Sequence, residues 1–297
     1  MWFRNLRIYT LAEDFAMPAD LEQALSAYQF TPCGRQELAS FGWTSPFGQQ
    51  SEVLYHQIGD NYLFCARKEE KVLPSSVVNA QLDEQLQQIE SEQGRRVAGK
   101  EKQALKEDLV HRLLPQAFTR FKLTWGMISL KQRIVVVDAS AGNRAEDFLG
   151  LMRSSFGSLP VKPLFNEQPS EVYFTEWLRA SQVPGDFEFG TEVELRDTDD
   201  EGGIVRCRQH DLTSTEIDTH LQHGKQATKL GLEWRERISF VLEHDLAVKR
   251  FKATDMLLDE QDKLVDASAE DKIDADFALF SGEINEFYPA LVSLFKS

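Results

Sequence analysis

The stretch from Phe64 to Lys122 constrains the fold more than any other part of the chain. Both of its ends have the composition of strands, while two segments between them have helical periodicity. The first segment repeats apolar residues along one face from Val77 to Ile89 and stops at Gly94. The second runs from about Lys100 to Leu114 and stops at Pro115. This order predicts two amphipathic helices inserted between strands.

The rest of the chain alternates between strand-type and helix-type segments. Strands are predicted at residues 2–11, 52–58, 62–68, 118–130, 133–139, 204–209, 226–233, 237–242 and 247–253. Helices are predicted from Pro18 onward, at about 143–156, 170–180 and 214–223, and in the tail from Ala267. We expect residues 30–48 to be turns and irregular edge structure, and residues 188–201 to be an acidic connector. The predicted fold class is α+β with mostly antiparallel sheets.

Three prolines in residues 160–170 mark the best candidate domain boundary. We therefore expect an N-terminal α+β part made of residues 1–75 and 119–165, and a helical basic arm at residues 76–118. Residues 166–297 would form a C-terminal α+β part that ends in an acidic helix.

The stretch around the arm is basic, although the chain of 297 residues has a formal net charge of −15. Residues 95–133 contain ten cations and three anions, a surplus of seven. Such a surplus favours a sequence-independent surface for a polyanion. The simpler interpretation of each lysine is the solvated face of an amphipathic helix. Both interpretations stay open at this point.

Several function classes lack their signatures. The chain contains no P-loop, GxGxxG, GxSxG or HExxH motif. Its paired carboxylates are scattered, so a metal-dependent nuclease is only a third hypothesis. Three widely spaced cysteines are typical of a reduced cytoplasm. We expect a cytoplasmic protein with no membrane span, no cofactor, no metal and no enzymatic activity.

Several long segments of the chain together resemble the RdgC family of recombination-associated proteins. They are MWFRNLRIY at the start, CARKEEKVLPSSVV, LLPQAFTRF, FGSLPVKPL and GGIVRCRQHDLTS. The resemblance implies a non-enzymatic, nucleoid-associated protein that binds double-stranded DNA without sequence preference. It implies a horseshoe-shaped protomer, and a ring-shaped homodimer that encircles DNA, limits access of the RecA recombinase and modulates recombination or replication.

The resemblance also suggests site residues. The cations expected to contact DNA are Arg67, Lys68, Lys71, Arg95, Arg96, Lys100, Lys102, Lys106, Arg120 and Lys122. By analogy with the family, Phe118 is expected at a dimer interface, together with Arg208, Gln209 and His210. Gln209 and His210 replace part of a longer cationic run in the family pattern.

A function from another class is the alternative. The chain can instead be an acidic protein-interaction module that inhibits recombination proteins directly, without encircling DNA. Charge reversal at Lys102 and Lys106 would leave inhibition by such a module intact.

Overall fold

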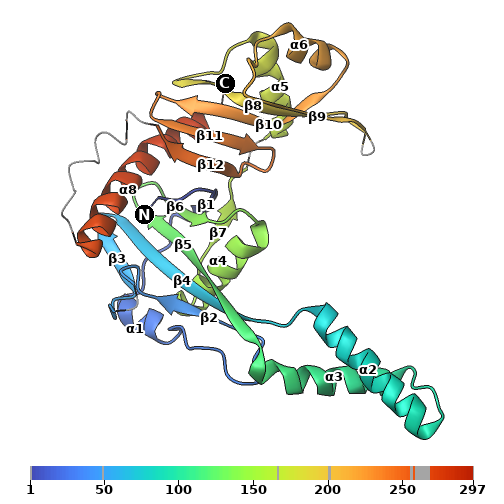
Figure 1. The fold of residues 1–297 in the computed structure, drawn as a ribbon. Coiled ribbons are helices and arrows are strands. Elements are labelled where there is room, and N and C mark those ends of the chain that lie inside the picture. The colour runs from blue at the N-terminus through green and yellow to red at the C-terminus, as the bar shows by residue number, and fades with distance from the viewer. Residues whose placement is uncertain are drawn as a thin grey trace. The chain divides into compact units, whose positions relative to one another are not determined.

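A computed structural model describes residues 2–48, 50–165, 167–199, 202–254, 257 and 268–296. The fold is α+β with a mostly antiparallel sheet, which confirms the predicted class. Neighbouring strands follow the order β2-β4-β5-β6-β1-β12-β11-β10-β8-β9, and β3 and β7 add to β4 and β1. The chain divides into two compact units (Figure 1).

Unit 1 comprises residues 1–27, 45–65 and 124–297. Its strands are β1 (Leu6–Leu11), β3 (Tyr55–Ile58), β6 (Ile134–Asp138), β7 (Val161–Pro163), β8 (Phe187–Arg196), β9 (Ile204–Arg208), β10 (Gln226–Trp234), β11 (Ile238–Glu243) and β12 (Val248–Ala253). Its helices are α1 (Leu21–Ser26), α4 (Gly142–Phe156), α5 (Ser170–Ala180), α6 (Thr215–Gln222) and α8 (Ala269–Ser293). Strands β4 (Asn61–Val72) and β5 (Phe118–Ser129) contribute residues to both units.

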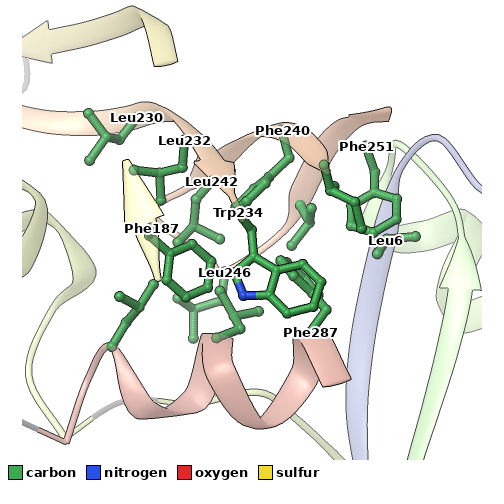
Figure 2. Close-up of a cluster of buried hydrophobic side chains, with 14 of the residues drawn as sticks. Leu6, Phe187, Leu230, Leu232, Trp234, Phe240, Leu242, Leu246, Phe251 and Phe287 are labelled. Atoms are coloured by element: carbon green, nitrogen blue, oxygen red, sulfur yellow. The ribbon is translucent and has the colours of Figure 1, made fainter. Parts of the chain in front are cut away.

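The core of unit 1 lies between the strands β8 and β10–β12 and the helix α8 (Figure 2). Phe287 of α8 packs edge-to-face on Trp234 and Phe240, with ring centroids 5.6 and 5.2 Å apart. The predicted apolar row of α8, which includes Phe277, Phe280 and Leu291, is fully buried. Ser268 caps the helix; the predicted start at Ala267 lies outside the described residues. The meander β10–β12 is antiparallel, as its alternating pattern predicted.

The prediction of an acidic connector at residues 188–201 is wrong for most of the described residues in that range. Residues 187–196 form β8, which pairs with β10 on one side and β9 on the other. The side chains of Val193 and Leu195 are buried, while Glu192, Glu194 and Arg196 lie on the opposite face of the strand. A strand with one charged face contains as many polar residues as a loop does, so composition alone does not distinguish the two. The alternation of apolar and charged residues does. Asp200 and Glu201 lie outside the described residues.

Unit 2 comprises residues 28–44 and 66–123, a range that includes all of the predicted arm at residues 76–118. Helices α2 (Ser75–Gln93) and α3 (Lys100–Leu113) form a hairpin whose small core is Val78, Leu82 and Leu109 (Figure 1). A 3-10 turn, η1 (Leu114–Gln116), follows α3. Gly94 ends α2 in the left-handed conformation, with φ of 64°.

Strand β2 (Ala39–Thr44) corrects the prediction of turns across residues 30–48. Trp43 is fully buried, and its backbone exchanges hydrogen bonds with Tyr28 and Phe30. Gly42 is required by close approach, because a Cβ there would lie 2.7 Å from the Phe30 backbone. Glycine therefore marks close packing of two backbones at this position, where the sequence suggested a turn.

Candidate nucleic-acid interface

One face of the sheet in unit 1 carries a dense set of charged side chains. Alternation along the strands places apolar residues in the core and charged residues on the opposite face. We define the charged face as Glu192, Glu194, Arg196, Arg206, Arg208, Lys229, Glu243, Lys249 and Arg250. These residues, Arg196 apart, line a shallow depression of about 270 Å³.

The signs of charge alternate across neighbouring strands of this face. Glu194 on β8 lies directly opposite Arg206 of β9 and Lys229 of β10 in the strand register. The Arg206 Nε donates to Glu194 Oε2 at 2.6 Å, and Lys229 Nζ lies 3.0 Å from Glu243 Oε1. Lys249 of β12 continues the row, 3.4 Å from Glu243. Each carboxylate on the row therefore has a cation on both sides.

A second pair of cations shares Glu192. The guanidinium of Arg250 donates from both terminal nitrogens to the two Glu192 oxygens, one at 2.6 Å. Arg208 Nε lies 3.7 Å from the same carboxylate. Gly190 and Gly231 leave a depression of about 280 Å³ beside this pair, where the backbones of β8 and β10 approach closely.

Glu194 is the most buried charged group of the face, with 5% of its side chain exposed. Burial alone would raise its pKa, but hydrogen bonds from Arg206 and Arg196 and the nearby charges of Lys229 and Arg196 outweigh burial. Together they lower the pKa of Glu194 to about 2. The carboxylate is therefore ionised at neutral pH.

The charged face has a positive surplus and remains accessible. Six cations stand against three carboxylates, which leaves a formal charge of +3. The side chains of Arg206, Arg208 and Arg250 are 61%, 73% and 53% exposed. Further along the same strands, Glu188, Glu233 and Lys252 add one net negative charge. Guanidinium groups held in this way match the geometry of phosphate oxygens.

The sequence prediction placed the DNA contacts in and around the arm, where several of the chosen cations form ion pairs. Arg95 makes a bidentate pair with Glu101, at 2.6 and 2.7 Å. Arg96 lies 3.8 Å from Glu90. Lys68 and Arg120 both contact Glu70, at 3.2 and 3.1 Å, and these contacts help to lower the pKa of Glu70.

Arg67 has a different environment from the other predicted cations. Its guanidinium lies over the rings of both Phe30 and Phe121, 4.8 and 4.6 Å from their centroids. Its Nε is buried and has no hydrogen-bond partner among the residues that the structure describes. The two rings therefore hold this cation in place.

The remaining predicted cations are lysines. Lys71 lies on β4, Lys122 on β5, and Lys100, Lys102 and Lys106 on α3. Lys102 and Lys106 line a groove of about 450 Å³ in the helical hairpin, together with Asp83 of α2. Within the described ranges, the ion pairs found include none of these five lysines.

The residues predicted at a dimer interface lie in both units. Phe118 begins β5 and is 87% exposed, and Phe121 is 59% exposed. Arg208 belongs to the charged face, and Gln209 follows it with φ of 52°. His210 Nε2 lies 2.9 Å from Glu216 and 3.1 Å from Ser214.

Most of the charged face is missed by sequence reasoning. A charge count along the chain does not select Arg196, Arg206, Lys229, Lys249 or Arg250. The available signal was alternation: cations and glutamates recur at i, i+2 on adjoining strands. These cations are separated in the sequence by glutamates and apolar residues. They come together on one face because the five strands β8–β12 lie side by side.

Neither a membrane span nor a metal cluster occurs in the described part of the chain. No helix there is long and apolar enough to cross a bilayer. No group of three or more His, Cys, Asp or Glu side chains in those same ranges is placed to hold a metal ion.

Comparison with known proteins gives a consistent result. A family model described as "Putative exonuclease, RdgC" matches residues 1–297. A relative from Tolumonas auensis is 44% identical over 294 residues, which are 99% of this chain and 97% of the relative. Relatives from Aeromonas hydrophila (44%; 98% and 96% covered) and Yersinia pestis (43%; 96% and 94% covered) are similar. All three are named "Recombination-associated protein RdgC", a name that gives no enzymatic activity.

Proposed function

The chain belongs to the RdgC family of recombination-associated proteins, and on that premise we propose that it binds double-stranded DNA without sequence preference. Two copies form a ring around the duplex, and the bound ring limits access of the RecA recombinase and so modulates recombination or replication. The protein acts in the cytoplasm on the nucleoid and needs no cofactor.

The charged face is the observation that carries this proposal. It presents exposed arginines on a rigid sheet, with a surplus of three positive charges in a chain of net charge −15. Contacts of this type recognise phosphates and carry little sequence information. The arm lysines Lys100, Lys102 and Lys106, with Lys122 of β5, offer a second set of mobile cations. An acidic remainder would repel DNA that approaches other surfaces.

The exposed aromatic residues of unit 2 support the dimer part of the proposal. Phe118 and Phe121 are largely exposed at the beginning of β5. With Leu123, three large apolar side chains are exposed within six residues of this strand, and such a concentration marks a protein interface more often than a solvated surface. We assign this strand end to contact with a second copy, and Gln209 and His210 to a second part of the dimer contact. Arg208, which the resemblance also placed at that contact, belongs to the charged face, and in this proposal its exposed guanidinium contacts DNA.

A salt titration tests DNA binding. Affinity for unrelated duplexes of equal length is measured between about 50 and 200 mM salt, where neutralising 6–10 phosphates changes affinity by roughly 10³–10⁵. We expect a steep, linear log–log dependence that is the same for every sequence. One strongly preferred sequence, or affinity that does not change with salt, would contradict the proposal.

Topology and cleavage separate the competing functions. A ring should dissociate more slowly from closed circular DNA than from short linear DNA, from which it can slide off. Equal dissociation rates would favour an open clamp. An acidic interaction module would inhibit RecA without any duplex affinity. Degradation of end-labelled duplex in the presence of Mg²⁺ would instead establish the nuclease activity in the family description.

A further inference from the structure

We infer that the glutamates Glu192 and Glu243 on the charged face are built-in competitors of the DNA phosphates. The inference rests on the proposed function, and it concerns how tightly and for how long the duplex is held. In the free protein these carboxylates occupy the cations that phosphate oxygens would contact. Binding is then an exchange of one anion for another at each cation.

The geometry of the free protein supports this exchange. Glu192 accepts from both terminal nitrogens of Arg250 and lies 3.7 Å from Arg208, so it engages two exposed guanidinium groups at once. Glu243 holds Lys229 at 3.0 Å and Lys249 at 3.4 Å.

The placement of the glutamates also distinguishes them from ordinary surface acids. The side chain of Glu192 is 27% exposed and that of Glu243 is 20% exposed, and both line the depression of the charged face. Glu192 is thus more buried than Arg208 and Arg250, so a phosphate that approaches the face meets these guanidinium groups first. It must then compete with a carboxylate that is already within hydrogen-bonding distance of Arg250.

Two consequences follow for the bound state. The carboxylates hold the long cationic side chains in defined positions, so less side-chain freedom is lost on binding. They also cancel part of the attractive charge and therefore weaken the complex. A protein that contacts any sequence along a duplex needs contacts that exchange readily. Glu192 and Glu243 make the contacts between cations and phosphates exchange readily, because each glutamate can take back its cations when a phosphate leaves.

The test compares Glu192→Gln with Glu176→Gln. The first change keeps the side-chain shape and removes one carboxylate from the charged face. The second removes one charge from the exposed side of α5, a helix that packs on the opposite face of the same sheet, so the net charge of the two variants is equal. A substitution of Glu194 is not used in this test. Its carboxylate is deeply buried, so the change would lower the stability of the fold as well as alter DNA binding.

Affinity and dissociation rate are measured on a random-sequence duplex at several salt concentrations, after the thermal midpoint of each variant is shown to match wild type. We expect Glu192→Gln to bind about 3- to 10-fold more tightly near 100 mM salt and to dissociate more slowly. The slope of log affinity against log salt concentration should steepen by about one. The freed cation neutralises one more phosphate, and that phosphate releases its condensed counterion. Glu176→Gln should behave like wild type, and Glu243→Gln should repeat the effect of Glu192→Gln.

The outcomes separate this inference from the proposed function. If wild type fails to bind duplex, the proposed function is overturned. If wild type binds and Glu192→Gln binds equally or more weakly, DNA binding stands but the competitor role is wrong. Equal tightening in Glu176→Gln would assign the effect to net charge and would also overturn the inference.

Discussion

At the scale of single residues, Glu194 shows how burial and charge combine. Its side chain is almost fully buried, yet three cations from its own and neighbouring strands keep it ionised. Removing one partner of a buried, hydrogen-bonded charge pair costs more than the pair itself contributes. We therefore expect Glu194 to contribute more to stability than Glu192 or Glu243, whose carboxylates are more exposed.

The pKa of Glu194 predicts a pH window. Because the folded pKa of about 2 is below the ordinary value of 4.5, the stabilisation is fully present above about pH 4.5 and is lost as the pH falls toward 2. The shift corresponds to at most about 3 kcal/mol. Urea unfolding of wild type and Glu194→Gln from pH 7 to pH 3 should give a difference in stability that shrinks below pH 4.5. A constant difference would contradict the assignment.

A second residue-scale feature is the contact between Gly126 on β5 and Phe148 on α4. A Cβ at Gly126 would lie 2.3 Å from the fully buried Phe148 ring. Glycine is therefore needed here for helix–sheet packing, although its backbone conformation is ordinary. We expect Gly126→Ala to lower the free energy of unfolding by about 1–3 kcal/mol through overpacking. Denaturant titration measures this, and Gly150→Ala on α4, where a Cβ meets nothing within 4 Å, is the control.

At the scale of elements, the α2–α3 hairpin depends on very few buried side chains. Its core is Val78, Leu82 and Leu109, and each helix exposes most of its other residues. Pairs such as Arg112 with Asp108 are exposed on both sides and contribute little. The stability of the hairpin therefore rests on packing between its two helices.

Truncation of Leu109 should affect the hairpin selectively. Leu109→Ala removes a side chain that is 2% exposed and should cost about 2–5 kcal/mol in the local stability of the hairpin. Hydrogen exchange should show lost protection in α2 and α3, with protection of β10–β12 retained. Loss of protection across both units would show that the hairpin core is coupled to the core of unit 1.

At the scale of the whole molecule, the proposed assembly depends on the exposed start of β5. We expect Phe118→Ala to weaken association of two chains while the fold is retained, because a side chain that is 87% exposed contributes little to the monomer. Sedimentation over a dilution series measures this. Phe165→Ala is the matched control, since Phe165 is 82% exposed in unit 1. Association that is unchanged by Phe118→Ala, or weakened equally by both changes, would contradict the assignment.

Most helices and strands, and the family, can be predicted from the amino-acid sequence alone. Helices α2 and α3 follow from apolar periodicity that ends at Gly94 and Pro115. The meander β10–β12 follows from the alternation of apolar and polar residues, and the buried face of α8 from its row of phenylalanines. These patterns are local, so neighbouring residues are sufficient to specify them. The resemblance to RdgC proteins likewise rests on contiguous segments such as CARKEEKVLPSSVV, which need no knowledge of the fold.

Which charges act together depends instead on the tertiary structure. A count along the chain selects residues 95–133, where the pairing of Arg95 with Glu101 occurs within one hairpin. The charged face is assembled from five strands spread between residues 187 and 253, and within each strand its cations are diluted by glutamates. Strand pairing brings Arg206, Glu194 and Lys229 into one row because residues far apart in sequence become neighbours about 5 Å apart. That distance is set by long-range pairing, which no local pattern in the sequence specifies.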